Sequence, residues 1–278
     1  MRPVRWAGAI LAAVFVTTAA TGPAAAGGGH DPGVVVQDVT IAVAGQAPVT
    51  AYVVRPRHAR PHSLAGVLYL HWFEPPASNQ NRTEFLGEAV ALAARGAVAV
   101  LPQLTFPWAA DPVGDVRDRQ AVEAQLAAVT AAYRALLRQP GVDPARTAVV
   151  SHDYGAMYGA LLTQREPRIR AEVFMAGDAT WANWFDTYWL GLPADEQAAY
   201  RRVFAGLDPV DNVSRIGAGL YLQWGGRDPF IPAGSREAFS AADPAAKVTL
   251  YDTATHELDQ RAVDDRTAWL VARLHLGA

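Results

Sequence analysis

The chain has 278 residues, of which 51% are hydrophobic and 18% are charged, and its formal net charge is −3. This balance excludes a mainly disordered chain, and without a basic surplus we expect no binding to nucleic acid or to an anionic membrane through charge. The sequence contains no cysteine, which excludes disulfides, thiolate nucleophiles and cysteine-ligated metal sites.

The first 26 residues have the pattern of a secretory signal peptide. Arg2 and Arg5 precede an apolar run, and Ala24 and Ala26 form an A-x-A cleavage site. The apolar run is shorter than the ~20 residues of a membrane-spanning helix, so we expect cleavage rather than an uncleaved anchor. We therefore expect a secreted protein, in which residues 27–278 form one domain with no membrane partner and no cofactor. The pattern carries no information on the oligomeric state.

Strand and helix patterns alternate along the rest of the chain. Two strands around a turn come first, and continuous apolar runs of strand length then alternate with helical stretches. This alternation predicts an α/β fold with a mostly parallel central sheet and helices on both faces. In chain order, the expected strands are Val34–Val43, Val49–Arg55, Ala65–Trp72, Ala97–Gln103, Arg146–His152, Arg170–Gly177, Ala218–Gly225 and Lys247–Asp252, and the expected helices are Arg82–Arg95, Asp115–Arg138, Tyr154–Gln164, Gly234–Ala242 and Arg261–His275.

The segment 178–213, between two expected strands, is too long for a simple crossover and is rich in aromatic side chains. One interpretation is a short helical lid over the sheet edge at which open α/β sheets bind ligands. The other is a packed excursion whose aromatic residues fill their own small core. Under the first interpretation, the expected substrate contacts are Trp181, Trp184, Tyr188 and Trp189.

A strand, a sharp turn and a helix around residue 153 carry the predicted chemistry. Ser151 and Gly155 stand two positions before and after Asp153, and both are small, as a strained nucleophile turn requires. If the pattern is centred on Ser151 instead, the bulkier Val149 and Asp153 occupy those two positions. The sequence therefore predicts a carboxylate, and not the serine, as the nucleophile.

The run Ser-His-Asp-Tyr-Gly-Ala at 151–156 resembles the Gly-His-Asp-Trp-Gly-Ala elbow of epoxide hydrolases and haloalkane dehalogenases. Both families have the α/β-hydrolase fold and an aspartate nucleophile. The front half of the chain is similar to the dienelactone hydrolase branch of the same fold, in which a helix near Glu84–Ala94 leads to the strand ending at Gln103. The resemblance implies an α/β-hydrolase fold with a short helical lid and a cofactor-free hydrolase activity.

Two further motifs complete a predicted catalytic triad. Asp228, in Gly-Gly-Arg-Asp-Pro, follows one expected strand, and His256, in Thr-Ala-Thr-His-Glu, follows the last one. Nucleophile, acid and histidine then occur in the chain order that this fold requires. We expect Asp153 to be the nucleophile, His256 the base and Asp228 the acid, with Asp178 as the fallback acid.

The loop His71-Trp72-Phe73-Glu74, after the first buried strand, lies where this fold builds its oxyanion hole. The expected donors are the backbone N–H of Tyr154 and that of Trp72 or Phe73. His71 and Glu74 are expected substrate contacts, although Glu74 adds a negative charge near the nucleophile. No metal site is expected, because the histidines nearer the N-terminus lack the helical spacing of a ligand pair.

A carboxylate nucleophile narrows the reaction. An aspartate side chain is ionised at neutral pH without a base and can attack a saturated carbon to form an alkyl–enzyme ester. Attack on a carboxylic ester gives a costlier anhydride, so the expected substrate is a small hydrophobic epoxide or alkyl halide. The expected donors to an epoxide oxygen are Tyr188 and Tyr200, and those to a halide are Trp72, Trp181, Trp184 and Trp189.

Two alternatives stay open on the sequence. One is an esterase or lactonase similar to dienelactone hydrolase, in which Asp153 is a base for water. The other is a non-catalytic binding protein on a hydrolase scaffold, although the presence of both Asp228 and His256 argues against it.

Overall fold

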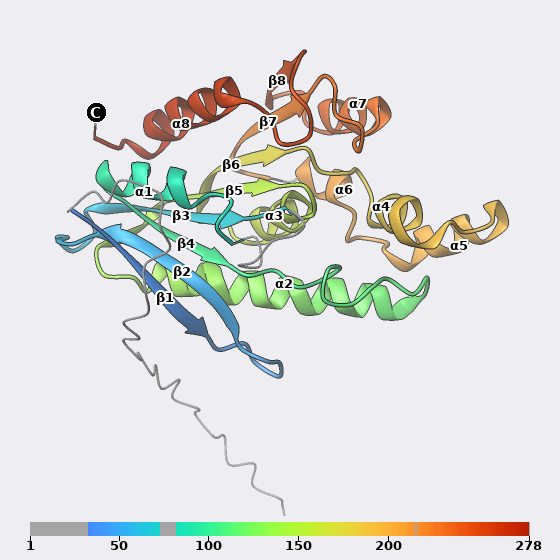
Figure 1. The fold of residues 1–278 in the computed structure, drawn as a ribbon, viewed down its shortest axis with the longest axis horizontal. Coiled ribbons are helices and arrows are strands. Elements are labelled where there is room, and N and C mark those ends of the chain that lie inside the picture. Colours follow the sequence, from blue (N-terminus) through green and yellow to red (C-terminus); the bar gives the residue numbers. More distant parts are fainter. Residues whose placement is uncertain (1–32, 73–81, 215, 278) are drawn as a thin grey trace, which may run out of the picture.

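The computed structural model describes residues 33–72, 82–214 and 216–277, which fold around an eight-stranded sheet (Figure 1). The strand order is β1-β2-β4-β3-β5-β6-β7-β8. β2 pairs antiparallel with β1 and β4, whereas β3 to β8 are parallel to one another. The strands are β1 (Val34–Ile41), β2 (Val49–Pro56), β3 (Leu64–Leu70), β4 (Ala97–Pro102), β5 (Val142–His152), β6 (Ile169–Met175), β7 (Gly219–Gly225) and β8 (Lys247–Tyr251).

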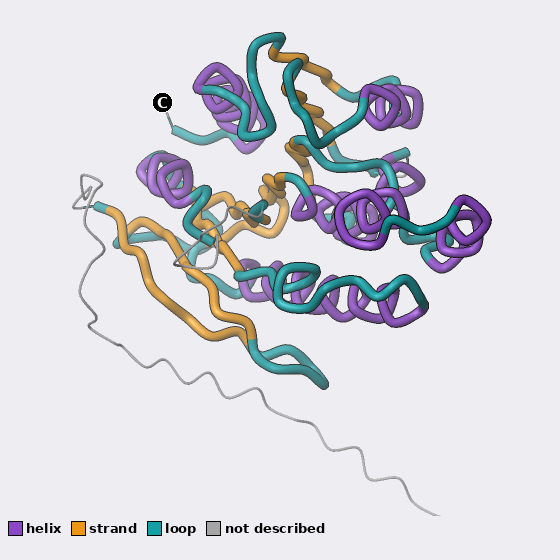
Figure 2. Tube along the Cα trace, turned by 45° about the vertical axis from the view of Figure 1, so that its right-hand side comes forward, coloured by secondary structure: helices purple, strands orange, loops and turns teal. Residues whose placement is uncertain are grey.

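Helices cover both faces of the sheet, which confirms the predicted α/β fold class (Figures 1 and 2). One hydrophobic cluster lies between the sheet and the helices α2 and α3, and a second lies between the opposite face and α1 and α8. The helices that flank the sheet are α1 (Leu86–Ala94), α2 (Val116–Leu137), α3 (Tyr154–Arg165), α7 (Ala233–Ala242) and α8 (Gln260–Leu274).

Apolar runs place the central strands in the interior. Every residue of β3 and of β4 is buried, as continuous hydrophobic strands of a parallel sheet require. α2 begins where the Asp115 carboxylate accepts a hydrogen bond from the backbone N–H of Arg117, and it ends at Leu137, shortly before Pro140.

Several element boundaries differ from the sequence expectation by one to four residues, and two of these differences lie near the site. β3 ends at Leu70 rather than Trp72, because its last backbone partner in β5 is Ser151 and the chain then leaves the sheet. α1 begins at Leu86 rather than Arg82, because residues 82–85 form a turn.

The connection between β6 and β7 contains short helices, so the segment 178–213 is helical. These lie beyond the carboxyl ends of the parallel strands, on the right-hand side of Figure 1. They are α4 (Trp181–Phe185), the π-helical turn η1 (Asp186–Leu190), α5 (Ala194–Val203) and α6 (Pro209–Val213).

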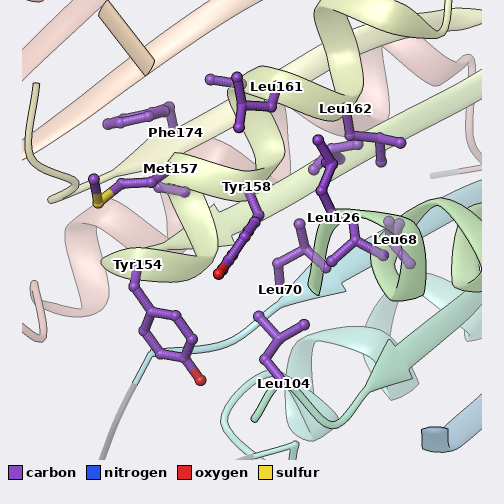
Figure 3. Close-up of a cluster of buried hydrophobic side chains, with 14 of the residues drawn as sticks. Leu68, Leu70, Leu104, Leu126, Tyr154, Met157, Tyr158, Leu161, Leu162 and Phe174 are labelled. Atoms are coloured by element: carbon purple, nitrogen blue, oxygen red, sulfur yellow. The ribbon is translucent and has the colours of Figure 1, made fainter. Parts of the chain in front are cut away.

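A dense hydrophobic cluster fixes α3 against the sheet (Figure 3). Met157, Tyr158 and Leu161 of α3 are fully buried, and they belong to the same cluster as Leu68 of β3 and Leu126 of α2. Truncation of a buried leucine in such a cluster costs about 2–5 kcal/mol of stability. This packing holds the amino end of α3, and with it the turn at residue 153, in one place.

Among the described residues, no helix combines the length and the apolar character needed to cross a bilayer. The predicted signal peptide, residues 1–26, lies outside the described residues, so cleavage and secretion stay predictions.

Candidate active site

Asp153 lies at the apex of a strained turn between β5 and α3. Its backbone angles are φ 56° and ψ −127°, a conformation that costs a residue with a side chain about 1–3 kcal/mol. The turn is held by the Asp153 N–H, which donates to the carbonyl of Met175 over 2.8 Å. A Cβ on Gly155 would lie 2.5 Å from the carbonyl oxygen of Leu70, so only glycine permits this close approach. The sequence pattern calls for a small residue two positions after Asp153, and this close approach is the steric reason for it.

The structure brings the three expected triad residues together. Nε2 of His256 lies 3.6 Å from Oδ1 of Asp153, and Nδ1 of His256 donates to Oδ2 of Asp228 over 2.9 Å. The other oxygen of Asp228 accepts hydrogen bonds from the backbone N–H groups of Phe230 and Ile231. Asp153 and His256 are 3% and 2% exposed, so the cluster is shielded from solvent. Asp228 is thereby fixed in the position from which it orients the imidazole.

Two carboxylates govern the charge of His256. Burial alone lowers its pKa, but hydrogen bonding and attraction from Asp153 and Asp228 outweigh burial and raise the pKa to about 10. Burial also raises the pKa of Asp228, but the imidazole and two backbone amides lower it below its usual range. The charges around the ring therefore favour the protonated imidazolium in the resting site.

This charge arrangement predicts a pH-dependent stability. The folded-state pKa of His256 lies above its ordinary value of 6.5, so its contribution is fully present below about pH 6.5 and is lost as the pH rises through about 10. We expect the difference in unfolding free energy between the protein and His256→Gln to shrink across that window. Denaturant unfolding of both proteins at a series of pH values measures it, and parallel profiles would contradict the assigned charge.

Ser151 does not face the site. Its side chain is fully buried in β5, and its hydroxyl donates to the carbonyl of Val173 in β6 over 3.1 Å. The expectation that Ser151 is not the nucleophile agrees with this geometry.

The substitution Ser151→Ala tests experimentally whether Ser151, rather than Asp153, is the nucleophile. We expect turnover within about twofold of the unmodified protein and a loss of about 1 kcal/mol of stability, because one buried hydrogen bond is removed. Steady-state kinetics and denaturant unfolding measure these two quantities. A loss of turnover as large as that of a nucleophile replacement would show that the serine takes part in the chemistry.

Asp178 is not placed to replace Asp228. Its Oδ1 accepts a hydrogen bond from the hydroxyl of Ser235, and its Oδ2 accepts one from the side-chain amide of Asn183. Both oxygens therefore hold the start of the helical insertion and the start of α7, while His256 is bonded to Asp228. The fallback assignment is wrong for this reason.

One expected oxyanion donor is already occupied. The backbone N–H of Trp72 donates to Oε2 of Glu84 over 2.7 Å, so the prediction that Trp72 supplies an oxyanion N–H is wrong in this structure. Tyr154 is the first residue of α3, where a backbone N–H has no partner within the helix, and it keeps the geometry of a donor. The other expected residues of this loop, Phe73 and Glu74, lie outside the described residues.

His71 holds the backbone rather than facing a ligand. Its Nε2 accepts a hydrogen bond from the backbone N–H of Leu104 over 2.9 Å, so Nδ1 carries the proton and donates to the carbonyl of Trp72 over 2.7 Å. Burial lowers the pKa of His71 to about 4, which keeps the ring neutral. The expectation of a substrate contact is wrong, because both ring nitrogens are bonded to the main chain.

The expected aromatic contacts divide into two groups. Trp181 is fully buried, and its indole N–H donates to the carbonyl of Leu207, so it belongs to the core of the insertion. The hydroxyl of Tyr200 donates to Asp118 of α2 over 2.6 Å and ties the insertion to that helix. Trp181 is therefore not a substrate contact, and neither Trp181 nor Tyr200 is the expected donor to the substrate. The polar group of each residue is already hydrogen-bonded within the protein.

The second group consists of Trp184, Tyr188 and Trp189, which connect to the triad through neighbouring aromatic rings. Phe230 contacts His256 edge to face at 5.0 Å between ring centroids, and Tyr188 packs on Phe230 at 5.9 Å. The Tyr188 hydroxyl also donates to the carbonyl of Phe230 over 2.7 Å. Trp184 packs on Tyr188 at 4.5 Å, and its buried indole N–H has no hydrogen-bond partner among the described residues.

Trp189 reaches the site from another direction. It packs on Trp108, whose ring contacts Tyr154 beside the nucleophile. Neither Trp108 nor Phe230 was expected as a site residue from the sequence. Phe230 stands two residues after Asp228 in the same motif, whereas Trp108 lies outside the motifs that mark the triad. Together with Trp184 and Tyr188 they form the aromatic wall, defined here as Trp108, Trp184, Tyr188, Trp189 and Phe230.

Two polar residues behind the triad were also missed. Nδ1 of His152 lies 2.6 Å from Oε1 of Glu84, and Nε2 of His152 lies 2.9 Å from the carbonyl oxygen of His256. The position of His152, directly before the nucleophile, was a signal in the sequence. Glu84 is 68 residues away along the chain, and no spacing rule connects the two. Among the described residues, no group of three or more histidine, aspartate or glutamate side chains has an arrangement that could hold a metal ion.

Comparison of the sequence with family models gave no match, and comparison with curated proteins gave no relative. Comparison of the structure gave clear matches. An acetyl xylan esterase from Paenibacillus sp. R4 superposes with a TM-score of 0.70 at 16% identity, covering 88% of this chain and 85% of that one. The chain has the α/β-hydrolase fold.

Two more structures of similar length support the same fold. A putative dienelactone hydrolase from Klebsiella pneumoniae has a TM-score of 0.60 at 18% identity, covering 87% of this chain and 98% of that one. An esterase from Pyrococcus furiosus has a TM-score of 0.61 at 15% identity, covering 91% and 96%. The predicted similarity to the dienelactone hydrolase branch is thus supported at the level of fold. The resemblance of the elbow to epoxide hydrolases and haloalkane dehalogenases stays a prediction from the motif.

Proposed function

We propose that the protein is a cofactor-free hydrolase in which Asp153 is the nucleophile, His256 the base and Asp228 the orienting acid. The observation that carries the proposal is a carboxylate at the apex of the elbow, 3.6 Å from an imidazole that a second carboxylate holds. The one hydroxyl in the elbow motif that resembles a nucleophile, that of Ser151, is bonded into the sheet. The likeness to hydrolases and esterases of this fold supports hydrolysis as the reaction type.

In the first step, an oxygen of Asp153 attacks a saturated carbon of the substrate. A carbon–oxygen bond forms, and the bond to the leaving group breaks with its electron pair on the leaving halide or epoxide oxygen. An epoxide oxygen then takes a proton from a donor in the site or from water. The product is an alkyl ester of Asp153, which is neutral, so one of the two charges that raise the pKa of His256 is gone.

In the second step, His256 acts as the base. Loss of the Asp153 charge lets the imidazolium release its Nε2 proton to solvent, and the neutral ring then accepts a proton from a water that attacks the ester carbonyl. The backbone N–H of Tyr154 stabilises the resulting oxyanion. Collapse of the tetrahedral intermediate expels the alcohol, which takes the proton from His256. The carboxyl group of Asp153, now with one oxygen from water, then passes its remaining proton to His256, which restores the carboxylate and the imidazolium.

The aromatic wall supports a small apolar substrate. Two of its members carry polar donors: Tyr188 has a hydroxyl held by a single backbone carbonyl, and Trp184 has a buried indole N–H without a partner among the described residues. The hydroxyl suits an epoxide oxygen and the indole suits a halide. The substrate class that we propose is therefore an epoxide or an alkyl halide.

A second candidate function rests on the fold comparison. The similar structures include a putative dienelactone hydrolase and an acetyl xylan esterase, which favours an ester or lactone as substrate. In that case Asp153 acts as a base for water and forms no covalent bond to the substrate.

A panel of three probes distinguishes these functions: an aryl epoxide, a short bromoalkane and p-nitrophenyl acetate. We expect turnover of the epoxide or the bromoalkane, lost in Asp153→Ala. Turnover of the acetate ester alone would overturn the proposal in favour of the esterase. No turnover of any probe would favour a binding protein.

We further propose that the protein is exported and that residues 1–26 are removed. The support is the charge, length and cleavage pattern of that segment. The N-terminal sequence of the protein recovered from the medium of an expressing bacterial host tests this proposal, and an intact Met1 would contradict it.

A further inference from the structure

The side chain of His152 lies between a carboxyl group and a backbone carbonyl. On one side, Nε2 lies 2.9 Å from the backbone carbonyl of His256, and on the other, Nδ1 lies 2.6 Å from Oε1 of Glu84. A carbonyl oxygen can only accept a hydrogen bond, so Nε2 must carry a proton. Two positions then remain for the shared proton: on Glu84, beside a neutral imidazole, or on Nδ1 of His152, which gives an imidazolium beside an ionised Glu84.

The surroundings favour the neutral pair. The His152 ring stacks on that of His256 at 5.1 Å between centroids, and His256 already carries a positive charge, so a second imidazolium there is disfavoured. Burial and the charge of His256 lower the pKa of His152 to about 3. An ionised Glu84 would also place a further negative charge near Asp153, whose repulsion raises the pKa of Glu84.

The other charged groups near the pair do not reverse this preference for the neutral form of His152 and Glu84. Burial raises the pKa of Glu84 well above its usual range, and repulsion from Glu88 and Asp153 acts in the same direction. Arg266 and the Trp72 amide act in the opposite direction, but Arg266 is itself paired with Glu88 through two hydrogen bonds. These groups together favour the arrangement in which the shared proton lies on Glu84.

The pair also connects three separate segments of the site. Oε2 of Glu84 accepts the backbone N–H of Trp72, which begins the loop after β3. His152 ends β5 directly before the nucleophile, and its Nε2–H donates to the loop that carries His256. The indole of Trp72 stacks on His152 at 5.3 Å and contacts His256 at 5.4 Å, so all three segments meet at this point.

We propose that Glu84 and His152 are positioning residues that act as a neutral link, in which the protonated Glu84 carboxyl donates to Nδ1 of His152 and Nε2–H of His152 holds the main chain of His256 in place. The role in turnover rests on the proposed function, whereas the position of the proton does not. The link holds the base next to Asp153 and holds the Trp72 segment without placing further ionised groups beside a site that already holds two carboxylates.

The substitution Glu84→Gln tests the link. A glutamine matches a protonated glutamate: its N–H donates to Nδ1 of His152 and its carbonyl accepts from Trp72. It cannot match an ionised glutamate, which accepts two hydrogen bonds. We expect kcat for Glu84→Gln within about threefold of the unmodified protein, and a fall in kcat of about 10- to 100-fold for Glu84→Ala, because the base is misplaced.

A matched control is Glu123→Gln, which removes an exposed carboxylate on α2 that pairs with Arg119. We expect it to leave kcat and KM unchanged. If Glu84→Gln instead lost as much activity as Glu84→Ala while retaining its melting temperature, the neutral link would be overturned.

A spectroscopic measurement separates this inference from the proposed function. In the ¹⁵N-histidine-labelled protein, we expect His152 to show the neutral Nε2–H tautomer without change between about pH 5 and pH 8, both in the unmodified protein and in Glu84→Gln. The low-field Nδ1–H proton of His256 should be kept in Glu84→Gln and shifted in Glu84→Ala. A doubly protonated His152, or a His256 signal indifferent to both substitutions, would overturn the proposal even if no substrate of the panel is turned over.

Discussion

Asp153→Asn should lower kcat by about 10⁴-fold or more on an epoxide or haloalkane substrate, because it removes the attacking carboxylate and leaves the rest of the triad in place. Asparagine tolerates positive φ better than most residues, so the strained turn at φ 56° should survive. Single-turnover and steady-state kinetics on the purified variant measure the loss.

The control for this prediction is Asp153→Ala, which cannot regain a carboxylate. Slow deamidation of the asparagine would restore activity with time, and peptide mass spectrometry detects it. Near-normal turnover in the alanine variant would show that Asp153 is neither the nucleophile nor the base.

His256→Gln should separate the two chemical steps. The attacking carboxylate needs no base, so the alkyl–enzyme ester should still form, while its hydrolysis should slow by about 10³- to 10⁴-fold. The ester should therefore accumulate, and intact-protein mass spectrometry should show an adduct of the substrate mass for an epoxide, or of the substrate without its halide for a haloalkane.

The matched control is the double substitution Asp153→Ala with His256→Gln, in which no adduct should form. If the single His256 variant also formed no adduct and lost all turnover, the imidazole would be required before any covalent bond forms. That result would favour the esterase, in which Asp153 and His256 activate water.

The strand and helix order of this fold follows from local patterns. The fully buried strands β3 and β4 appear in the sequence as unbroken apolar runs, and the turn at Asp153 is marked by small residues whose steric need the structure shows at Gly155. Asp228 and His256 could be predicted because the carboxyl ends of parallel strands converge at one edge of the sheet.

The errors at the site have a common physical origin. The roles of Trp72, His71 and Trp181 depend on which distant group takes each polar atom: Glu84 takes the Trp72 amide, Leu104 bonds His71, and Leu207 takes the Trp181 indole. These contacts join segments far apart in the chain, and no local spacing encodes them. For the same reason the sequence did not connect Glu84 with His152.

The proposed mechanism depends most on a covalent bond between Asp153 and the substrate. A single turnover with excess enzyme in water enriched in oxygen-18, followed by peptide mass spectrometry, tests for this bond directly. If the bond forms, the heavy oxygen enters the carboxylate of Asp153 and is absent from the diol or alcohol formed in that first turnover. Label in the product and none in the Asp153 peptide would show that water attacks the substrate itself, and would contradict the nucleophile assignment.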